Sequence, residues 1–327
     1  MLYQPPFPSR LPSHSAELPL TLISLEDWVL VMLNGKDTIK YLQGQLTCDV
    51  CSLKGNQFCF SAHCNPKGKM LSYLCVFHYY DGIGLFERRS VLDFQLKEMK
   101  KYAVFSKTRI IVNDSVVLLG LAGFQARVAM NKLFTVLPDI SCPVVYHQNT
   151  TVLYFNLPKP RFLLITTPTI CDMFQKILMG QVQLNNSQQW LSLEIEAGYP
   201  IIDSANVEEF IPQAVNIQAL GGISFTKGCY IGQEIVARAK YRGANNRALY
   251  WCSGVSSYLP DIGDSLELKI GNNWKPTGKV LAACRLKNNI IYVQVVLNNT
   301  LLYDSILRVV GDNACTLFVQ TLPYMLC

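Results

Sequence analysis

The sequence predicts an α+β protein that ends in a small β-barrel. Its 327 residues suffice for two domains, or for three small ones. Up to about residue 244, segments of helical periodicity alternate with strand-like apolar runs. Beyond that point the helical period disappears, and short apolar runs alternate with turns rich in Asn, Asp and Gly. We therefore expect a mixed region over 1–244 and a barrel over 245–327.

The composition supports a large folded core. Half of the residues are hydrophobic and 16% are charged, against a usual charged share of about 25%. A chain this long and this apolar can bury a sizeable core, which excludes general disorder. The 29 basic and 23 acidic residues leave a net charge of +6. That excess is mild and does not resemble the charge of a histone.

The composition of the N-terminal segment and the number of cysteines bear on the cellular compartment in which we expect the protein. Residues 1–19 are rich in Pro and Ser and predict an extended arm without the apolar core of a signal peptide. The longest apolar runs, such as 29–33 and 116–123, fall far short of the roughly 18 residues that a membrane span needs. We therefore expect a cytoplasmic protein without membrane contact, whose 12 cysteines are reduced and mostly buried.

The first elements of the mixed region follow from caps and turn residues. Residues 34–45 predict a short helix capped near Asn34. Two strands, 70–80 and 83–87, flank a hairpin turn at Asp81–Gly82.

The next segment, 88–102, predicts an amphipathic surface helix whose apolar positions are Val91, Phe94 and Met99. Two strands at 108–113 and 115–121 and a helix at 124–134 follow. The chain then continues as a mixed strand and helix stretch to about 180.

The charges change sign sharply after residue 226. Residues 186–226 contain five acids and no Lys or Arg, whereas residues 227–247 contain five bases and one acid, Glu234. Such a switch often marks nothing more than a solvated helix face beside an acidic neighbour. The functional alternative is a basic rim for an anionic ligand or for nucleic acid.

Standard catalytic and metal motifs are absent from the sequence. No phosphate-binding loop, HExxH or GxSxG pattern occurs, and four His offer few candidates for His-based catalysis. Cys48, Cys51, Cys59 and Cys64 include one CxxC spacing, but they lack the two tight pairs of a zinc ribbon. We expect no stable metal.

The strongest chemical candidate is the segment 222–243. Cys229 precedes a predicted helix that begins after Gly232, and Lys227 stands two residues before the thiol. A helix dipole and a neighbouring cation both favour a thiolate. Gly228 and Gly232 would permit close approach of the backbone to a ligand. A structural turn cysteine is the alternative, and composition alone does not choose between the two.

This segment closely resembles the YgfZ family of folate-binding proteins, relatives of the aminomethyltransferase (GcvT) of the glycine cleavage system. The signature is complete in Lys227, Gly228, Cys229, Tyr230, Gly232, Gln233 and Glu234. Further matching segments are 41–50, 62–70, 101–107, 119–127, 185–206, 210–234 and 322–324. The resemblance thus extends over nearly the whole chain.

The resemblance implies a GcvT-like fold of three modules around a central channel that holds tetrahydrofolate or a derivative. Two modules would be interleaved within 1–244, with a split near 115, and the third would be the barrel. It also implies support of iron–sulfur enzymes, notably those that methylthiolate tRNA, and an effect on the regulation of replication initiation. The family's cysteine corresponds to Cys229, and its two folate-associated tryptophans correspond to Trp28 and Trp190.

Residue chemistry is consistent with those positions. A Trp ring offers a rigid face for a flat pterin, and the carboxylate of Glu196 suits the donor edge of the pterin. The anionic glutamate tail of folate makes Lys227, Arg238 and Arg242 plausible folate-binding residues.

The sequence also departs from the enzyme branch of the family. Leu71, Ser72 and Tyr73 occupy the stretch in which aminomethyltransferases carry a catalytic carboxylate, and Glu194 stands where they tend to have Arg. We therefore expect a monomeric, folate-binding accessory factor with Cys229 as its reactive thiol. A folate-dependent aminomethyl- or methyl-transferase is the second hypothesis. Direct RNA binding through the basic 227–247 window is the third, although few aromatic residues are interleaved with the bases there.

Overall fold

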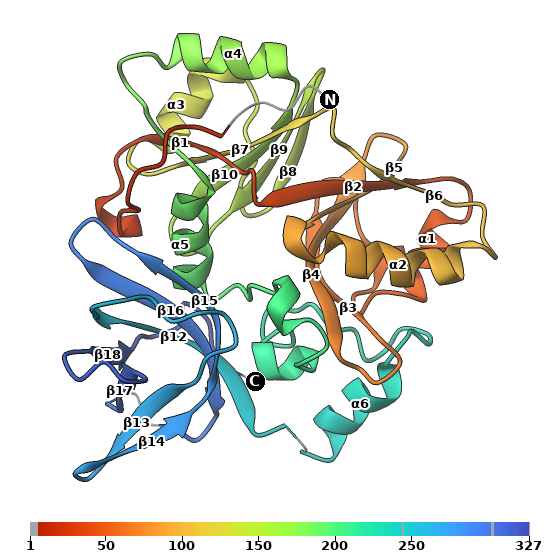
Figure 1. The fold of residues 1–327 in the computed structure, drawn as a ribbon. Coiled ribbons are helices and arrows are strands. Elements are labelled where there is room, and N and C mark those ends of the chain that lie inside the picture. Colours follow the sequence, from red (N-terminus) through yellow and green to blue (C-terminus); the bar gives the residue numbers. More distant parts are fainter. Residues whose placement is uncertain (1–5, 244, 302–303, 327) are drawn as a thin grey trace.

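A computed structural model describes residues 6–243, 245–301 and 304–326. Within these ranges the chain forms three sheets, of six, five and seven strands. Figure 1 shows the sheets as three modules grouped around the segment that follows α5 (Ser187–Ala197). The expected α+β class and the all-β C-terminal module are confirmed.

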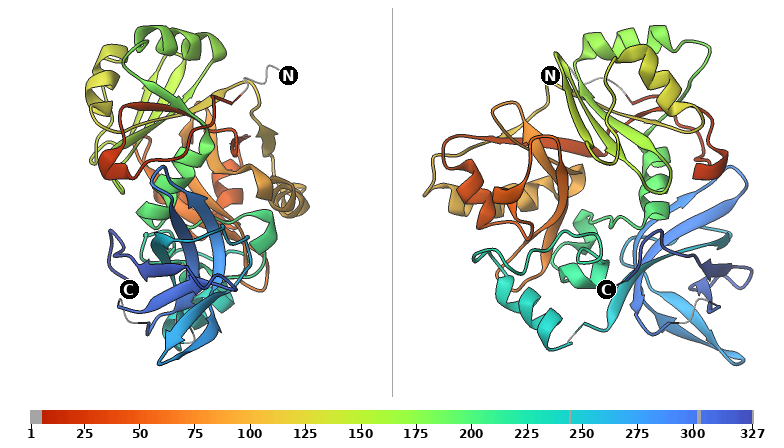
Figure 2. Two further views of the ribbon diagram at one scale, coloured as in Figure 1. Left: turned by 60° about the vertical axis from the view of Figure 1, so that its left-hand side comes forward. Right: turned by 180° about the vertical axis from the view of Figure 1, so that it is seen from behind.

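The six-stranded sheet has the order β11-β1-β7-β10-β9-β8 and is antiparallel except for the β1–β11 pair. Its strands are β1 (Thr21–Ser24), β7 (Val117–Ala122), β8 (Val144–His147), β9 (Thr150–Phe155), β10 (Arg161–Thr166) and β11 (Gln183–Asn185). Helices α3 (Ala126–Leu133) and α4 (Pro168–Ile177) cover its outer face, as both views in Figure 2 show.

The five-stranded sheet has the order β3-β4-β5-β2-β6. Its strands are β2 (Trp28–Asn34), β3 (Phe58–Cys64), β4 (Met70–Tyr79), β5 (Gly82–Arg88) and β6 (Arg109–Val112), with helices α1 (Thr38–Gln43) and α2 (Leu92–Ala103) beside it. Because β1 belongs to the first sheet, β2–β6 to the second and β7 again to the first, the two modules are interleaved along the chain.

The seven-stranded antiparallel sheet forms the C-terminal barrel. Its strands are β12 (Arg247–Val255), β13 (Leu266–Ile270), β14 (Asn273–Thr277), β15 (Lys279–Arg285), β16 (Ile290–Asn298), β17 (Ile306–Val309) and β18 (Thr316–Val319). The amide of Val280 donates to the carbonyl of Asp264 at 2.8 Å, which draws the start of β15 against the segment leading into β13. Helix α6 (Gln233–Tyr241) precedes the barrel.

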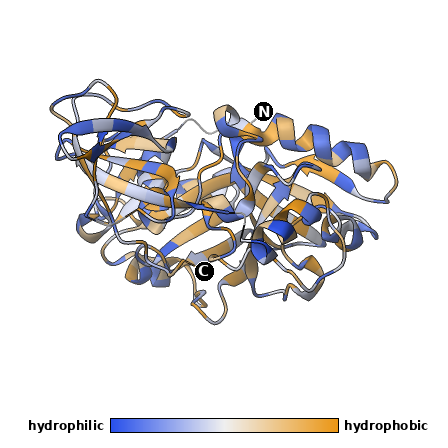
Figure 3. Cartoon of the chain, turned by 90° about the horizontal axis from the view of Figure 1, so that it is seen from below, coloured by the Kyte–Doolittle hydropathy of each residue, from blue (hydrophilic) through white to orange (hydrophobic). Residues whose placement is uncertain are grey.

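One core joins the three modules. Its largest cluster combines Leu163 of the first sheet, Phe86 of the second, Tyr292 of the barrel and Trp190 of α5. In Figure 3 the interior strands are largely hydrophobic, and hydrophilic residues are commoner on the outer helices and loops. A shared core fixes the relative positions of the modules, because burying apolar surface between them is the dominant favourable term.

Several local predictions need correction. The predicted helix 34–45 begins after Asp37 rather than at Asn34, since Asn34 still belongs to β2. The hairpin turn is Tyr80–Asp81, because Gly82 already pairs with Tyr79.

The prediction counts Phe94 among the apolar positions of the amphipathic helix α2, but this residue is 48% exposed. The buried positions Val91, Gln95 and Met99 are spaced four residues apart, which defines one helix face. Phe94 lies about 100° from Gln95 around the helix axis and therefore faces outward.

The N-terminal arm is extended as predicted over its described part, apart from a short turn at Ser15–Glu17. The amide of Ser13 donates to Gln189 of α5 at 2.8 Å, and the carbonyl of Pro12 accepts from Lys287 of the barrel at 3.0 Å. The arm thus bridges α5 and the barrel. Over the described ranges, every helix is too short or too polar to traverse a lipid bilayer.

Candidate functional site

A small cavity lies where the two interleaved modules meet α5. It is lined by Trp28, Phe60, Tyr73, Cys75, Phe86, Glu87, Arg88, Phe155, Glu194, Pro200 and Ile201. These residues come from β2, β3, β4, β5, β9, α5 and the segment after α5. The open volume is about 20 Å³, enough for about one water molecule. We call this space the central cavity.

Aromatic side chains form one wall of the central cavity. Trp28 and Phe86 stack with their ring centroids 6.3 Å apart and their planes within 9°. Trp28 pairs with Arg88 across the β2–β5 ladder, and this register brings the guanidinium to 4.5 Å from the Trp28 ring centroid. Arg88 in turn binds the carboxylate of Asp203 through two hydrogen bonds, of 3.1 and 3.2 Å. The wall is therefore flat, aromatic and held in place from behind.

Glu194, which lines the central cavity, belongs to a buried ion pair. Nη2 of Arg161 lies 2.8 Å from Oε1 of Glu194, and both side chains are almost completely buried. Burial raises the pKa of the Glu194 carboxyl, and the charge of Arg161 opposes that rise. Removing either partner would leave a buried charge without compensation.

Tyr73 supplies a free hydrogen-bonding group to the central cavity. Its hydroxyl is buried and has no partner among the described residues. Burial, and then the neighbouring charge of Glu194, raise the pKa of Tyr73 well above its usual value. The hydroxyl therefore stays protonated and can donate a hydrogen bond to a molecule that enters the cavity.

The predicted folate residues do not all reach this cavity. Trp28 lines it, whereas Trp190 is fully buried behind it, with Arg161 4.2 Å above its ring centroid. Glu196 points elsewhere, because it accepts hydrogen bonds from the backbone amide (3.2 Å) and the hydroxyl of Ser15 in the N-terminal arm. Glu194, two residues earlier on the same helix, lines the cavity together with Glu87 of β5.

The signature segment docks on the turn after α1. The amide of Ile231 donates to the carbonyl of Gly44 at 3.1 Å, and the amide of Ser224 donates to Thr47 at 2.9 Å. Nζ of Lys227 donates to the carbonyls of Leu46 and Cys48, both at 2.7 Å. Burial lowers the pKa of Lys227, and the nearby cysteines and Asp49 oppose that fall. Lys227 therefore anchors the segment rather than facing an open ligand site.

Two glycines allow the segments 62–70 and 227–234 to pack closely against each other. Gly232 has a φ of 81°, and a Cβ there would lie 2.7 Å from the carbonyl oxygen of Asn65. Gly68 has a φ of 69°, and a Cβ there would lie 2.8 Å from the Cβ of Ile235. Glycine is required at both positions by backbone conformation and by this close approach.

Cys229 is exposed at the tip of the docked segment and does not line the central cavity. Gly228 beside it is surrounded by open space. Tyr230 is buried next to Lys227, whose Nζ lies 5.0 Å from the centroid of its ring. The thiol is thus presented to solvent, where a large partner can reach it.

The remaining signature and basic residues lie on α6 and its ends. Gln233 opens the helix, and Glu234 binds Arg238 at 2.6 Å on its exposed face. Arg242 is exposed at the C-terminal end. None of these residues is among those that line the central cavity.

Sequence reasoning missed Arg161 and the hydroxyl of Tyr73. The only signal for Arg161 was a charged residue opening an otherwise apolar strand, β10. Cys48, Cys51, Cys59 and Cys64 are free thiols. The described part of the chain contains no group of three or more His, Cys, Asp or Glu suited to a metal ion.

Comparisons with known proteins identify close relatives of this sequence. A family model described as "YgfZ, beta-barrel domain" matches residues 245–312. The chain is 65% identical over 319 residues to the tRNA-modifying protein YgfZ of Sodalis glossinidius, covering 98% of this chain and 97% of that one. It is 56% identical over 326 residues to the protein of the same name from Serratia proteamaculans, covering 100% and 99%.

Among solved structures, the glycine cleavage system aminomethyltransferase T of Bartonella henselae has a similar fold. The two align with a TM-score of 0.72 at 16% sequence identity, over 94% of this chain and 87% of that one. At this identity the likeness concerns the fold alone, and with the matched barrel domain it confirms the expected GcvT-like arrangement.

Proposed function

The chain belongs to the YgfZ family of tRNA-modifying proteins, and from this premise we propose that it binds tetrahydrofolate or a derivative in the central cavity. With this ligand it would support the assembly or repair of iron–sulfur enzymes that modify tRNA. The observation that carries the proposal is the central cavity itself, where an unpartnered Tyr73 hydroxyl and the Glu194 carboxylate lie beside the Trp28 ring. Flat aromatic and hydrogen-bonding groups are what a pterin ring requires.

The chemistry of the cavity fits a pterin, but its present volume does not. A space of about 20 Å³ holds one water molecule, so the cavity has to widen when a ring system enters. When bound, tetrahydrofolate would supply its capacity to carry one-carbon units. Trp28 would stack on the ring, Tyr73 would donate a hydrogen bond to it, and Glu194 would accept hydrogen bonds from its amino group.

We propose Cys229 as the residue that acts on the client enzyme. Its exposed position allows contact with a partner protein of the tRNA methylthiotransferase type. A single thiol cannot hold a stable cluster, which normally has four protein ligands. Its role would therefore be transient ligation of iron or exchange with a client sulfur.

The stretch 71–73 of β4 lacks the carboxylate that an aminomethyltransferase carries there, and the carboxylates that line the central cavity, Glu87 and Glu194, come from β5 and α5. Leu71 is buried in β4, and Tyr73 points into the cavity without a carboxylate. We therefore propose an accessory factor rather than a transferase. A monomeric state, a cytoplasmic location, a ligand-binding unit over 1–244 with a barrel over 245–327, and an indirect effect on replication initiation are parts of the same proposal.

The first test replaces the aromatic wall. We expect Trp28→Ala to weaken binding of tetrahydrofolate, measured by anaerobic calorimetry, by about tenfold, because a stacked aromatic pair contributes about 0.5–1.5 kcal/mol beyond its buried area. Trp274→Ala is the matched control, since this half-buried tryptophan belongs to the barrel strand β14. Equal affinity in Trp28→Ala and wild type would remove the cavity from the proposal.

The second test replaces the thiol. In a strain without the gene, we expect wild type and Cys51→Ser to restore tRNA methylthiolation, and Cys229→Ser to fail. Cys51 is a suitable control because it is also an exposed free thiol. The readout is the fraction of methylthiolated nucleoside in digested tRNA, measured by mass spectrometry. Full restoration by Cys229→Ser would show that this thiol has no chemical role.

A further inference from the structure

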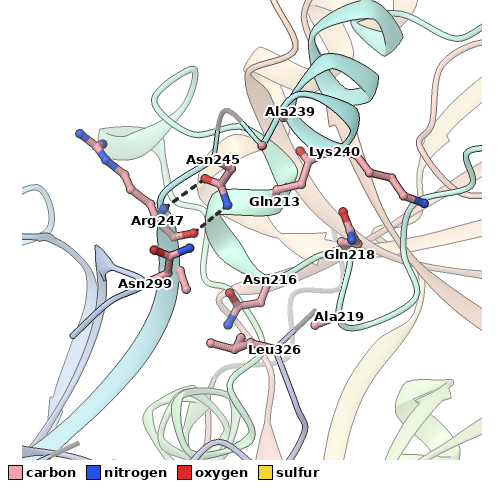
Figure 4. Close-up of a pocket in the computed structure, with 12 residues that line it drawn as sticks. Gln213, Asn216, Gln218, Ala219, Ala239, Lys240, Asn245, Arg247, Asn299 and Leu326 are labelled. Atoms are coloured by element: carbon pink, nitrogen blue, oxygen red, sulfur yellow. Dashed lines mark hydrogen bonds between the residues drawn. The ribbon is translucent and has the colours of Figure 1, made fainter. Parts of the chain in front are cut away.

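A second, polar pocket lies between the C-terminal end of α6 and the start of the barrel strand β12 (Figure 4). Its volume is about 480 Å³. Five carboxamide side chains line it, those of Gln213, Asn216, Gln218, Asn245 and Asn299, and none of the described lining residues is acidic. It shares no lining residue with the central cavity.

One of these carboxamides has an unused hydrogen-bonding atom. Gln213 is 8% exposed, and its Nε2 donates to the carbonyl of Val236 at 2.6 Å. Its Oε1 is buried and has no partner among the described residues. A buried polar atom without a partner costs free energy, so this oxygen is available to accept a hydrogen bond from a molecule in the pocket.

Two cations flank the carboxamides. In Figure 4 the side chains of Lys240 and Arg247 extend outward on opposite sides of the pocket. Neither makes an ion pair within the described part of the chain, and Glu234, the one acid of the window 227–247, is bound by Arg238. Both charges are therefore available to an anionic ligand.

Aromatic rings adjoin one of the cations. Nζ of Lys240 lies 3.8 Å from the ring centroid of Phe225 and 5.5 Å from that of Tyr241. The side chain of Tyr241 is 70% exposed. In the sequence, few aromatic residues lie among the basic residues of 227–247. The fold adds Phe225, which precedes this window, next to Lys240.

From these observations we propose that this pocket binds one nucleotide of a single-stranded RNA segment. The side chains of Asn216 and Asn245 are already hydrogen-bonded to the backbone of Leu249 and Arg247. The carboxamides of Gln218 and Asn299, together with Oε1 of Gln213, therefore supply the donors and acceptors that match the edges of nucleobases. Cations on both sides match the phosphates before and after that nucleotide, and the exposed tyrosine offers a stacking surface for a neighbouring base. The site is independent of folate, so the failure of either proposal leaves the other standing.

The contribution of the two cations to RNA binding is tested with a fluorescently labelled 12-nucleotide single-stranded RNA. Its affinity is measured by fluorescence anisotropy over a series of salt concentrations. We expect Lys240→Ala/Arg247→Ala to bind roughly tenfold more weakly at low salt, and its plot of log K against log salt to be shallower by about 1.4, for two lost phosphate contacts. Lys97→Ala/Lys100→Ala is the control, because it removes two exposed lysines of α2. An equal loss in both double variants would show diffuse attraction and overturn the proposal.

The base contacts are tested without changing the charge. Gln218→Leu/Asn299→Leu should weaken RNA binding, keep the salt dependence of wild type, and leave the binding of an inorganic polyphosphate of equal length unchanged. A DNA strand of the same sequence and a duplex RNA should both bind more weakly than the single-stranded RNA. The proposal is overturned if polyphosphate binding falls with RNA binding, if the DNA or duplex binds as tightly, or if wild type does not bind the RNA.

Discussion

Trp28 and Trp190 show how one residue type takes two roles in this site. Trp28 presents its ring to the central cavity, whereas Trp190 packs on Gly120 of β7, where an added Cβ would lie 2.5 Å from the indole. Trp190 serves the cavity through Arg161, whose guanidinium it covers at 4.2 Å. Arg161 then neutralises Glu194. The tryptophan behind the cavity thus keeps a buried charge in position without needing to touch a ligand.

We therefore predict that Trp190→Ala lowers the free energy of unfolding by about 3–5 kcal/mol, the usual cost of deleting a large buried aromatic side chain. Trp190→Phe should recover a large part of this loss, because it fills much of the space above Gly120. Urea unfolding followed by circular dichroism measures both variants, with Trp274→Ala as the reference for a half-buried tryptophan. A loss below about 1 kcal/mol in Trp190→Ala would contradict the packing role.

At the scale of elements, the docking of the signature segment depends on Lys227. Its ammonium donates to two carbonyls of the turn after α1, and Gly68 and Gly232 allow the neighbouring backbones to meet. We predict that Lys227→Met leaves both carbonyls unpaired and destabilises the docked segment by about 1–3 kcal/mol. Hydrogen exchange at the amides of Ser224 and Ile231 should accelerate, while α2 is unchanged. Lys97→Met is the control, and unaltered exchange at both amides would contradict the anchoring role.

Periodicity and turn residues were sufficient to predict most elements of the fold but not the orientation of α5. The hairpin β4–β5, the helix α2 and the all-β C-terminal module follow from alternation, helical spacing and turns. Helix α5 is different, because ten of its eleven residues are buried. A helix buried all round has no amphipathic stripe, so nothing in the sequence indicates whether Glu194 or Glu196 faces the central cavity.

Long-range contacts explain the rest of the difference between sequence and structure. Glu196 is occupied by Ser15, which lies 181 positions earlier, and Lys227 by carbonyls about 180 positions earlier. The residues that neighbour Glu196 and Lys227 in the sequence give no indication of these distant hydrogen-bond partners. The matching family motifs could indicate that these residues belong to one site, but their partners depend on the three-dimensional arrangement.

At the scale of the whole molecule, three modules share one core, so a buried group in any module bears on global stability. His63 of β3 is such a group, since it is fully buried and burial lowers its pKa from 6.5 to about 4. In the unfolded chain His63 takes up a proton below about pH 6.5, whereas in the folded chain it stays neutral down to about pH 4. The stability due to neutral His63 is therefore complete above pH 6.5 and is lost as the pH falls toward 4.

We predict that wild type loses about 2–3 kcal/mol of unfolding free energy relative to His63→Gln between pH 7 and pH 4.5, because each pKa unit corresponds to about 1.4 kcal/mol. Taking the difference between the two proteins removes the contributions of Glu194 and the other carboxyl groups, which titrate in both. Urea unfolding at the two pH values gives the four free energies required. A difference that stays constant with pH would show that His63 is protonated equally in the folded and unfolded chains and would contradict the prediction.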